Sequence, residues 1–355
     1  MATRALILSA DIGAGHDLPA ELLAGALRER GAETLVVDGL RAMGRIPQAL
    51  GRDGMETILR RAPLVFDAEY WLVQTFAPTR TLATRLLGAV GGPPLLRLIE
   101  RLQPDVVVST YPGTTEVLGG LRRAGRLTVP CAAAITDLAG LRYWAHPGVD
   151  QHLIVHAESR ADVVAITGAG GDVRPVRGFS RPAFERPPSR TAARAVLGLN
   201  GGPVVVISGG GWGVGDVEGA ARVARRAGAQ AVCLCGTNAT LRARLQRAGV
   251  RALAFTDRMC EWLAAADVLV HSTAGLTVFE AQVCGTRVIS YGWGVGHIRA
   301  NNAAYRRHGI AAVAAGPKAL EGEIERALAA GPPTPLGIAG RQSAADAVLE
   351  LVSAR

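Results

Sequence analysis

A histidine closes the first glycine-containing loop of the chain, in a position that suits acid–base chemistry. The loop Ser9-Ala10-Asp11-Ile12-Gly13-Ala14-Gly15-His16 follows an apolar run and precedes a helix predicted at Pro19–Glu29. Glycines at a strand-to-helix turn let the backbone approach a ligand, and a neutral imidazole can accept a proton from an attacking hydroxyl. We predict that Gly13 and Gly15 shape a ligand loop and that His16 is a general base. A hydrogen-bonded structural histidine is the alternative.

A denser glycine loop begins the second half of the chain. The apolar run Val204–Ile207 leads through Ser208 into five glycines within the seven residues Gly209–Gly215, and a helix is expected from about Asp216. Backbone of this kind is typical of loops whose N–H groups surround a phosphate. The pattern departs from the dinucleotide fingerprint, because no acidic residue ends the next predicted strand at the usual distance. A tight structural turn is the alternative.

Three further segments carry polar groups suited to a nucleotide-linked ligand. Small residues lead into a helix with Thr277 and Glu280, where a hydroxyl, helix amides and a carboxylate would meet a phosphate and a ribose diol. A capping box explains the same Thr-x-x-Glu spacing equally well. The loop Phe255–Met259 would hold a flat base, and His297 with Asn301 would meet sugar hydroxyls. Turn and cap roles are the alternatives for these residues.

The charge of the chain comes almost entirely from arginine. The formal net charge is +9, and Lys318 is the only lysine. Attraction to anionic lipid or nucleotide phosphates is one explanation, and a biased Ala/Arg/Gly composition is the other. A nucleic-acid partner is not expected, because no arginine-rich tail or aromatic-interleaved basic run occurs. The five cysteines indicate neither a disulfide framework nor a metal cluster, so we expect buried free thiols and no metal.

Short apolar runs alternate with helix-like Ala/Leu/Arg stretches along the chain. Runs of this kind suit parallel strands buried on both faces and joined by right-handed crossovers, as in doubly wound α/β sheets. The first series of predicted strands is Ala5–Ser9, Thr34–Val37, Asp105–Ser109, Ala132–Ile135, Gln151–Val155 and Arg174–Val176. The second is Val204–Ile207, Ala231–Leu234, Ala252–Phe255, Val268–Val270, Arg287–Ser290 and Ala311–Val313.

A turn-rich segment between Gly178 and Pro203 separates the two series and indicates a linker. We predict an N-terminal Rossmann-like domain at 1–178, a linker at 179–202, a C-terminal Rossmann-like domain at 203–338 and a C-terminal helix within 339–355 that packs back on the N-terminal domain. Ligands of such sheets bind outside the carboxyl ends of the strands, so a cleft between two facing domains is the expected site. No apolar run is long enough to cross a bilayer, and Leu6–Ala10 is too short for a signal peptide, so a cytoplasmic protein is expected.

Taken in order, these segments resemble the GT-B glycosyltransferases of the MurG and monogalactosyldiacylglycerol-synthase group, which includes the processive diacylglycerol glucosyltransferases. The likeness runs from about Ala5 to Ala312. It rests also on Arg101-Leu102-Gln103-Pro104-Asp105-Val106-Val107-Val108-Ser109-Thr110-Tyr111-Pro112, Thr136-Asp137-Leu138 with Trp144 and Asp150, Gly178–Phe184 and Cys235-Gly236-Thr237-Asn238. The resemblance implies an acceptor-binding N-terminal domain and a C-terminal domain that binds a nucleotide sugar.

The resemblance also implies a reaction and a site. Members of this group transfer a hexose from a UDP-sugar, with inversion and without a metal in the transfer centre, to a lipid such as diacylglycerol. We therefore expect no cofactor and a protein peripheral to the anionic inner face of the cell membrane. His16 would be the base, with Asp137 as its alternative. Residues implied at the donor are Gly210, Gly211, Gly275, Leu276 and Thr277 at the diphosphate, Glu280 at the ribose, Arg258 and Met259 at the uracil, and His297 and Asn301 at the sugar.

Three positions depart from the family pattern. Ser272 stands where the family carries a lysine or arginine, His297 and Ile298 stand where a Gln-Glu or Gln-Asp pair reads the sugar, and Leu141 replaces a histidine of the acceptor segment. Nucleotide binding is therefore better supported than any one sugar. A UDP-sugar epimerase and a nucleotide-sugar-binding protein with weak or no turnover are the alternative functions.

The segment Ile58–Leu102 interleaves arginines with large apolar side chains. This mixture suits a surface that meets an anionic membrane. Helices packed on the N-terminal core, with arginines on a solvated face, explain it equally well. The residues concerned are Arg60, Arg61, Arg80, Arg85 and Arg97 with Val65, Phe66, Trp71, Leu72, Phe76, Leu86 and Leu87.

Overall fold

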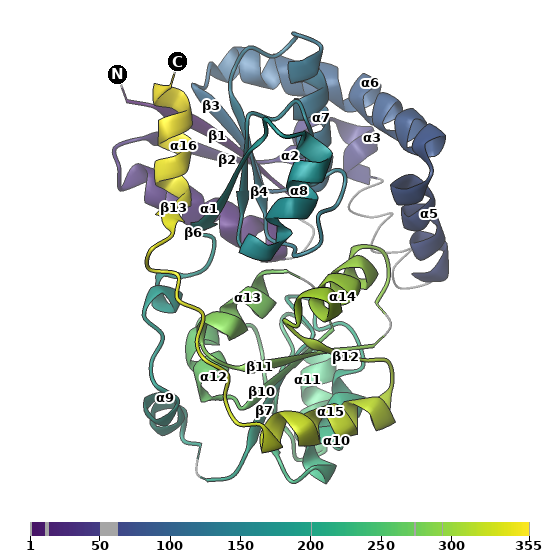
Figure 1. Ribbon diagram of the computed structural model, residues 1–355, viewed down its shortest axis with the longest axis vertical. Helices are drawn as coiled ribbons and strands as arrows, with labels where there is room; N and C mark the ends of the chain where they lie inside the picture. The colour runs from purple at the N-terminus through teal and green to yellow at the C-terminus, as the bar shows by residue number, and fades with distance from the viewer. Residues whose placement is uncertain are drawn as a thin grey trace. The chain divides into compact units, whose positions relative to one another are not determined.

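The computed structural model describes residues 2–10, 14–49, 63–199, 201–272, 275–292 and 294–354, except for the side chains of residues 14, 63–66 and 69. The chain divides into two compact units. The first consists of Met1–Ser180, Val295–His297 and Arg341–Arg355, and the second of Arg181–Gly294 and Ile298–Gly340. Each unit is an α/β domain built on its own parallel sheet (Figure 1).

The first unit contains a seven-stranded sheet in the order β13-β6-β5-β4-β3-β1-β2. Its strands are β1 Arg4–Ser9, β2 Glu33–Asp38, β3 Val106–Ser109, β4 Cys131–Ile135, β5 Gln151–Ile154, β6 Asp172–Arg177 and β13 Gln342–Ser343. The pairing is parallel throughout, and Leu6 of β1 lies opposite Leu35 on one side and Val107 on the other. Strands β3 and β4 are buried along their whole length, as their continuous apolar sequences predict.

Helices pack on this sheet through a shared hydrophobic core. A buried cluster joins β1 and β3 to α2, α6 and α7 through side chains such as Leu6, Met43, Leu95, Val107 and Leu118. The helices of the first unit are α1 Ala14–Arg28, α2 Gly39–Ala42, α3 Arg45–Gln48, α5 Pro63–Thr75, α6 Ala77–Leu102, α7 Pro112–Arg123, α8 Arg160–Thr167 and α16 Ala344–Ser353, with the 3-10 turn η2 Ala157–Ser159.

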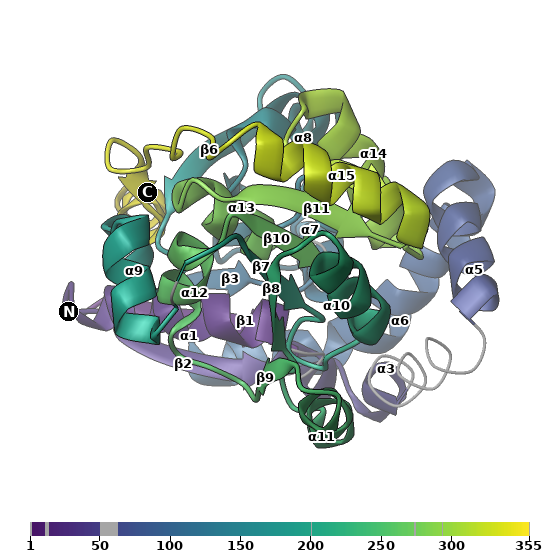
Figure 2. The ribbon, with the colours of Figure 1, turned by 90° about the horizontal axis from the view of Figure 1, so that it is seen from below.

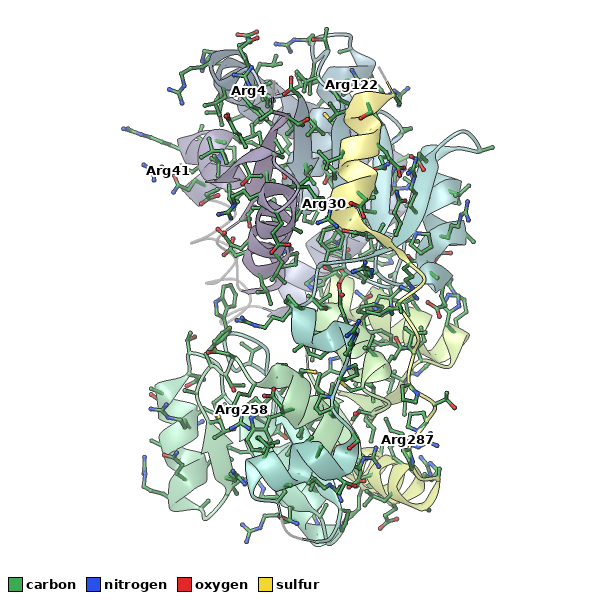
Figure 3. All side chains as sticks on the ribbon, turned by 90° about the vertical axis from the view of Figure 1, so that its left-hand side faces the viewer. Arg4, Arg30, Arg41, Arg122, Arg258 and Arg287 are labelled. Atoms are coloured by element: carbon green, nitrogen blue, oxygen red, sulfur yellow. The ribbon has the colours of Figure 1, made fainter. Side chains whose placement is uncertain are left out.

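The C-terminal residues of the chain complete the first unit. Strand β13 pairs with β6, and α16 packs against α1. Ion pairs join Arg30 to Asp346 and, at 2.7 Å, Arg174 to Glu350; Figure 3 shows Arg30 beside this helix. These pairs are partly exposed, so burial of the alanine and valine face of α16 contributes more to the docking than the charges do.

The second unit contains a six-stranded parallel sheet in the order β12-β11-β10-β7-β8-β9. Its strands are β7 Val204–Ser208, β8 Gln230–Leu234, β9 Arg251–Leu253, β10 Val268–His271, β11 Arg287–Tyr291 and β12 Ala312–Ala314. Its helices are α9 Arg190–Leu197, α10 Val217–Arg226, α11 Ala239–Arg247, α12 Met259–Ala265, α13 Leu276–Val283, α14 His297–His308 and α15 Pro317–Ala329, with η3 Pro182–Glu185. The first residue of α14, His297, is counted with the first unit. Helix α10 packs against α15, and α9 packs against α12 (Figure 2).

The predicted fold class is confirmed in both units. Each of the twelve predicted strands coincides with an observed strand, with ends that differ by at most two residues. Helix α1 begins at Ala14, five residues before the predicted start, because Pro19 lies inside the helix and not in its first turn. Strand β13 was not predicted, since two residues are too few to show a strand pattern.

Two expectations about the whole chain can be compared with the structure. All five cysteines are free thiols, as predicted, although Cys284 is only half-buried while the other four are buried. None of the helices in the described ranges has the length and apolar character that a membrane crossing requires. Of the arginines predicted to face a membrane, Arg60 and Arg61 lie outside the described residues.

Candidate functional site

In the first unit, the polar residues selected from the sequence lie beyond the carboxyl ends of neighbouring strands. Strands β1, β3 and β4 are adjacent in the sheet, and the strand order reverses between β1 and β3. His16 follows β1, Thr110 and Tyr111 follow β3, and Asp137 follows β4. Doubly wound sheets bind ligands at such a reversal. The topology therefore places His16 and Asp137 at one edge of one sheet.

His16 is held by the backbone of the segment after β3. Its Nδ1 lies 2.9 Å from the carbonyl oxygen of Thr110, and the Thr110 hydroxyl donates to the carbonyl of His16 at 3.1 Å. A carbonyl oxygen only accepts hydrogen bonds, so Nδ1 carries the hydrogen and Nε2 of the neutral ring carries the lone pair. This is the tautomer that a general base acting through Nε2 requires.

Burial keeps the His16 ring neutral. Desolvation lowers the pKa of His16 to about 4, although the hydrogen bond to Thr110 acts in the opposite direction. The rings of Tyr111 and Trp144 lie beside it, with centroid distances of 5.3 and 5.6 Å. Such a ring keeps its lone pair at neutral pH but is a weak base, so proton uptake must accompany bond formation by the attacking oxygen.

Asp137 is buried directly beyond β4. Burial raises the pKa of Tyr70 on α5, and the nearby Asp137 carboxylate and Tyr143 add to this effect. Gln74 of the same helix donates to the carbonyl of Arg142 at 3.4 Å. Tyr143 has a φ of 78°, a left-handed conformation that costs a non-glycine residue of order 1–3 kcal/mol and clusters at functional sites. Helix α5 therefore packs against a strained segment that begins at Asp137.

Two histidines, the half-buried His146 and the buried His152, hold the rest of this segment. His146 Nδ1 accepts a hydrogen bond from the Gly148 amide at 2.9 Å, and His152 Nε2 accepts one from the His146 amide at 3.2 Å. Burial lowers the pKa of both rings to about 4, which keeps these nitrogens unprotonated. Glu116 on α7 lies 3.9 Å from His146 Nε2, and burial raises its pKa to about 7. These groups are structural supports of the segment.

In the second unit, the glycine loop after β7 packs tightly against the loop after β8. A Cβ at Gly213 would lie 2.3 Å from the carbonyl oxygen of Cys235, and a Cβ at Gly236 would lie 2.2 Å from that of Gly211. The Thr237 amide also donates to the Gly211 carbonyl at 2.8 Å. Close packing of two backbones therefore explains part of the glycine density that the sequence attributed to phosphate binding. Gly210 and Gly211 are half-buried at the tip of the loop.

Helix α13 begins beyond β10, but a capping box does not start it. Its N-cap is Gly275, without a side-chain cap, so Thr277 is the second residue of the helix. The capping-box explanation of Thr277 and Glu280 is therefore wrong. Glu280 is buried on this helix, and Thr277 is half-buried. The amides of Leu276 and Thr277 belong to the first turn, which has no intrahelical acceptors and attracts anions.

The loop before α12 lies next to a cavity of about 580 Å³. Arg258 is the N-cap of this helix and Met259 its first residue; the Arg258 amide donates to the Thr256 hydroxyl at 3.1 Å. The cavity is lined by Val196, Arg251, Phe255, Thr256, Arg258 and Trp262, among others. Its volume falls within the range of small-molecule sites.

The remaining predicted site residues belong to α14 and to the segment at the start of α1. His297 opens α14 and is half-buried, whereas Asn301 is fully buried within the same helix. Gly15 is exposed in the first turn of α1, and Gly13 lies outside the described residues. Within the described ranges, no group of three or more His, Cys, Asp or Glu side chains suits a metal ion.

The structure adds residues that the sequence did not single out. Thr110 and Tyr111 contact His16, and Tyr70 lies near Asp137. Thr110 and Tyr111 stand in the segment that supported the family resemblance, which was the available signal. No feature of the sequence indicated Tyr70, because its closeness to Asp137 depends on how α5 packs.

The first unit matches a protein-family model. Residues 16–172 match the model of monogalactosyldiacylglycerol (MGDG) synthase. This range begins at His16 and includes Asp137, so both base candidates lie within the matched region.

Curated relatives resemble larger parts of the chain. A processive diacylglycerol beta-glucosyltransferase of Staphylococcus carnosus is 25% identical over 199 residues, which cover 53% of this chain and 50% of the relative. A probable monogalactosyldiacylglycerol synthase 2, chloroplastic, of Oryza sativa subsp. japonica is 27% identical over 311 residues, which cover 81% of this chain and 66% of the relative. The chain thus spans about half to two thirds of the length of these relatives.

Solved structures share the fold. MurG of Acinetobacter baumannii superposes with a TM-score of 0.59 at 13% identity, covering 99% of this chain and 100% of that chain. Arabidopsis thaliana UGT89C1 complexed with UDP superposes with a TM-score of 0.59 at 11% identity, covering 99% of both chains. At such identities the likeness shows the fold alone. The predicted GT-B fold class and the predicted resemblance to the MurG and MGDG-synthase group are confirmed.

Proposed function

We propose that this protein is an inverting glycosyltransferase that moves a hexose from a UDP-sugar to a diacylglycerol-type lipid. The observation that carries the proposal is the geometry of His16. Its Nδ1 hydrogen is directed to the Thr110 carbonyl, and its low pKa keeps Nε2 available. The match to the MGDG-synthase model and the diacylglycerol glucosyltransferases among the relatives support the lipid acceptor.

In the proposed reaction, the acceptor hydroxyl attacks the anomeric carbon while Nε2 of His16 takes its proton. The bond to UDP breaks on the opposite side with its electron pair, so the anomeric configuration inverts and UDP leaves. Amides of the first turn of α13 and of Gly211 would stabilise the charge that develops on the diphosphate, whereas the Gly210 amide already donates to the Ser208 hydroxyl at 3.3 Å. Glu280 would accept hydrogen bonds from the ribose, and the proposal requires neither a metal nor a resident cofactor.

The proposed acceptor lies in a membrane, and one helix pair offers a surface for it. On α6, Leu82, Leu86 and Val90 are 59%, 57% and 40% exposed and four residues apart, so they share one face. Trp71 on α5 and Phe76 between the helices are 52% and 51% exposed. The second half of α6 packs its apolar side chains into the core instead. Core packing therefore accounts for that half only, and we propose that the exposed face contacts an anionic membrane.

The chemical test is a donor and acceptor panel. The purified chain is incubated with UDP- and dTDP-sugars and with diacylglycerol in vesicles, and the products are identified by mass spectrometry and NMR. A hexosyl-diacylglycerol of inverted configuration is expected. A retained configuration, or no lipid product with any donor, would contradict the proposal. An epimerised donor would instead support the epimerase alternative.

A membrane test uses flotation with vesicles. Replacement of Leu82 and Leu86 by serine should reduce flotation with anionic vesicles several-fold, and salt should reduce it for the unaltered chain. Val196→Ser is the matched control, because Val196 is 65% exposed on the second unit. Flotation that is absent, or independent of salt, would argue for a soluble acceptor. The proposed location is peripheral to the inner face of the cell membrane.

A nucleotide-sugar-binding protein with little turnover is the second candidate, and Ser272 favours it. Its hydroxyl lies against Gly215, where a Cβ would approach it to 2.3 Å. A neutral side chain therefore occupies a packed position near the proposed diphosphate, where the family carries a cation. Tight UDP binding without product across the donor panel would establish this alternative.

A further inference from the structure

A buried tyrosine lies behind the first turn of α13. Tyr305 on α14 is 0% exposed, and its hydroxyl oxygen accepts a hydrogen bond from the Gly275 amide at 3.3 Å. Gly275 is the N-cap of α13, so this bond is made where the proposed diphosphate segment begins. A tyrosine side chain therefore holds a main-chain group that sequence reasoning had assigned to the ligand.

The backbone at Gly275 depends on contacts outside its own helix. Its φ of 92° and ψ of −131° lie in a region that glycine alone adopts readily, and no side chain caps the helix at this residue. A buried amide without an acceptor is costly, so the Tyr305 hydroxyl stabilises this conformation. With the Gly275 amide engaged, the amides of Leu276 and Thr277 are the next donors at this end of α13.

The tyrosine is held by rigid parts of the second unit. Its ring meets the ring of His271, the last residue of β10, edge-on at a centroid distance of 5.9 Å. Its helix is joined to β11 by the Ser290 hydroxyl, which donates to Asn302 Oδ1 at 2.6 Å. The hydroxyl position is thus set by two strands and a helix and does not depend on a loop.

We propose that Tyr305 is a positioning residue for the donor diphosphate. Its hydroxyl holds the Gly275 amide so that the amides of Leu276 and Thr277 are aimed at the phosphate oxygens. This inference rests on the proposed function, because it assigns α13 to the diphosphate of a UDP-sugar. It adds a residue that touches no substrate and acts through the backbone.

The test variant is Tyr305→Phe, which keeps the ring and removes the hydroxyl. Binding of UDP and of uridine is measured by titration for each protein, and the ratio of the two dissociation constants reports the contribution of the phosphates. The variant should bind UDP roughly tenfold more weakly, with uridine binding changed less than about twofold, because one buried hydrogen bond is lost at the phosphate turn. A merely structural role would weaken both ligands equally.

The matched control is Thr286→Val, which removes another buried hydroxyl hydrogen bond of the second unit, the one that Thr286 donates to the Leu263 carbonyl at 2.5 Å. The Tyr305–Gly275 bond remains in place, so the ratio of the dissociation constants for UDP and uridine should not change. If Tyr305→Phe leaves this ratio as it is in the unaltered protein, or if Thr286→Val changes it equally, the positioning role is overturned. If the unaltered protein does not prefer UDP to uridine, the proposed function fails as well.

A second measurement does not require the variant to fold. In the unaltered protein without ligand, the Gly275 amide should exchange with solvent slowly, because it is buried and hydrogen-bonded. Residue-resolved hydrogen exchange by NMR tests this directly. Rapid exchange of this amide would overturn the proposal.

Discussion

The candidate sites of the two units use different kinds of chemical group. In the first unit, the proposed chemistry depends on a side chain: His16 has one tautomer and a low pKa because of Thr110 and burial. In the second unit, the proposed diphosphate site depends on the main chain at the glycine loop and at the first turn of α13. The difference matches the two proposed tasks, because proton transfer requires a group whose pKa can be adjusted, whereas phosphate binding requires several donors in a fixed arrangement.

The two sites should therefore fail in different ways. A side-chain site loses its function when one group is removed, even where the fold is retained. A backbone site loses its function when the loop geometry changes, even where no functional group has been removed. The following experiments test this contrast.

The largest effect is expected from His16→Ala. Loss of the general base should lower kcat by about 10² to 10⁴, while UDP affinity changes less than about threefold. The measurements are steady-state kinetics and UDP titration. If turnover and UDP affinity fell together, His16 would be a structural histidine and the contrast between the sites would be lost.

A glycine substitution tests the second site. Alanine at Gly213 would place its Cβ 2.3 Å from the Cys235 carbonyl at a φ of 59°. The loop must shift, so UDP affinity should fall by roughly ten- to a hundredfold, since misplaced binding groups of this kind cost about that much. Gly228→Ala is the control, because Gly228 has a φ of 75° and no atom within 4 Å of the position that a Cβ would take. Equal effects of the two changes on UDP affinity would remove the special role of the glycine loop.

A smaller effect is expected from Glu280→Gln. The carboxylate is proposed to accept hydrogen bonds from the ribose, so the variant should bind UDP roughly tenfold more weakly. Its preference for UDP over 2′-deoxy-UDP should also shrink. The two ligands are compared by calorimetry. An unchanged preference would refute the ribose assignment and leave backbone contacts as the main determinants of donor binding.

The smallest effect is expected in the pH dependence of stability, which arises from titratable groups of the first unit. His16, His146 and His152 have pKa values lowered from 6.5 to about 4, so the unfolded chain binds more protons than the folded chain between these pH values. Stability from these groups is present above pH 6.5 and is lost as the pH falls toward 4. Glu116, with its pKa raised to about 7, acts in the opposite direction.

As the pH falls, the free energy of unfolding should therefore decrease by about 1.4 kcal/mol per pH unit for each proton that the unfolded chain binds in excess of the folded chain. Urea unfolding at several pH values measures the slope, and His152→Asn should reduce it. A slope of zero or of opposite sign between pH 6.5 and 5 would contradict the burial of these rings.

Much of the fold was predictable because most of its strands contain a short apolar run and are separated by turn formers. The runs Val106–Val108 and Val204–Ile207 illustrate this, since burial on both faces favours apolar side chains at successive positions. The start of α1 was predicted too late, because a proline pattern does not reveal that the helix extends before Pro19. Contacts between distant segments, such as Tyr70 near Asp137, cannot be read from local patterns.

The sequence by itself determined the two parallel sheets, the order of their strands along the chain, and the placement of His16, Gly210 and Glu280 after strand ends. These properties follow from local composition and periodicity. Only the tertiary structure decided which nitrogen of His16 carries the hydrogen, which glycines are needed for packing, and that Tyr305 holds Gly275. These depend on atoms from segments far apart in the chain, because hydrogen bonding and close packing act through space.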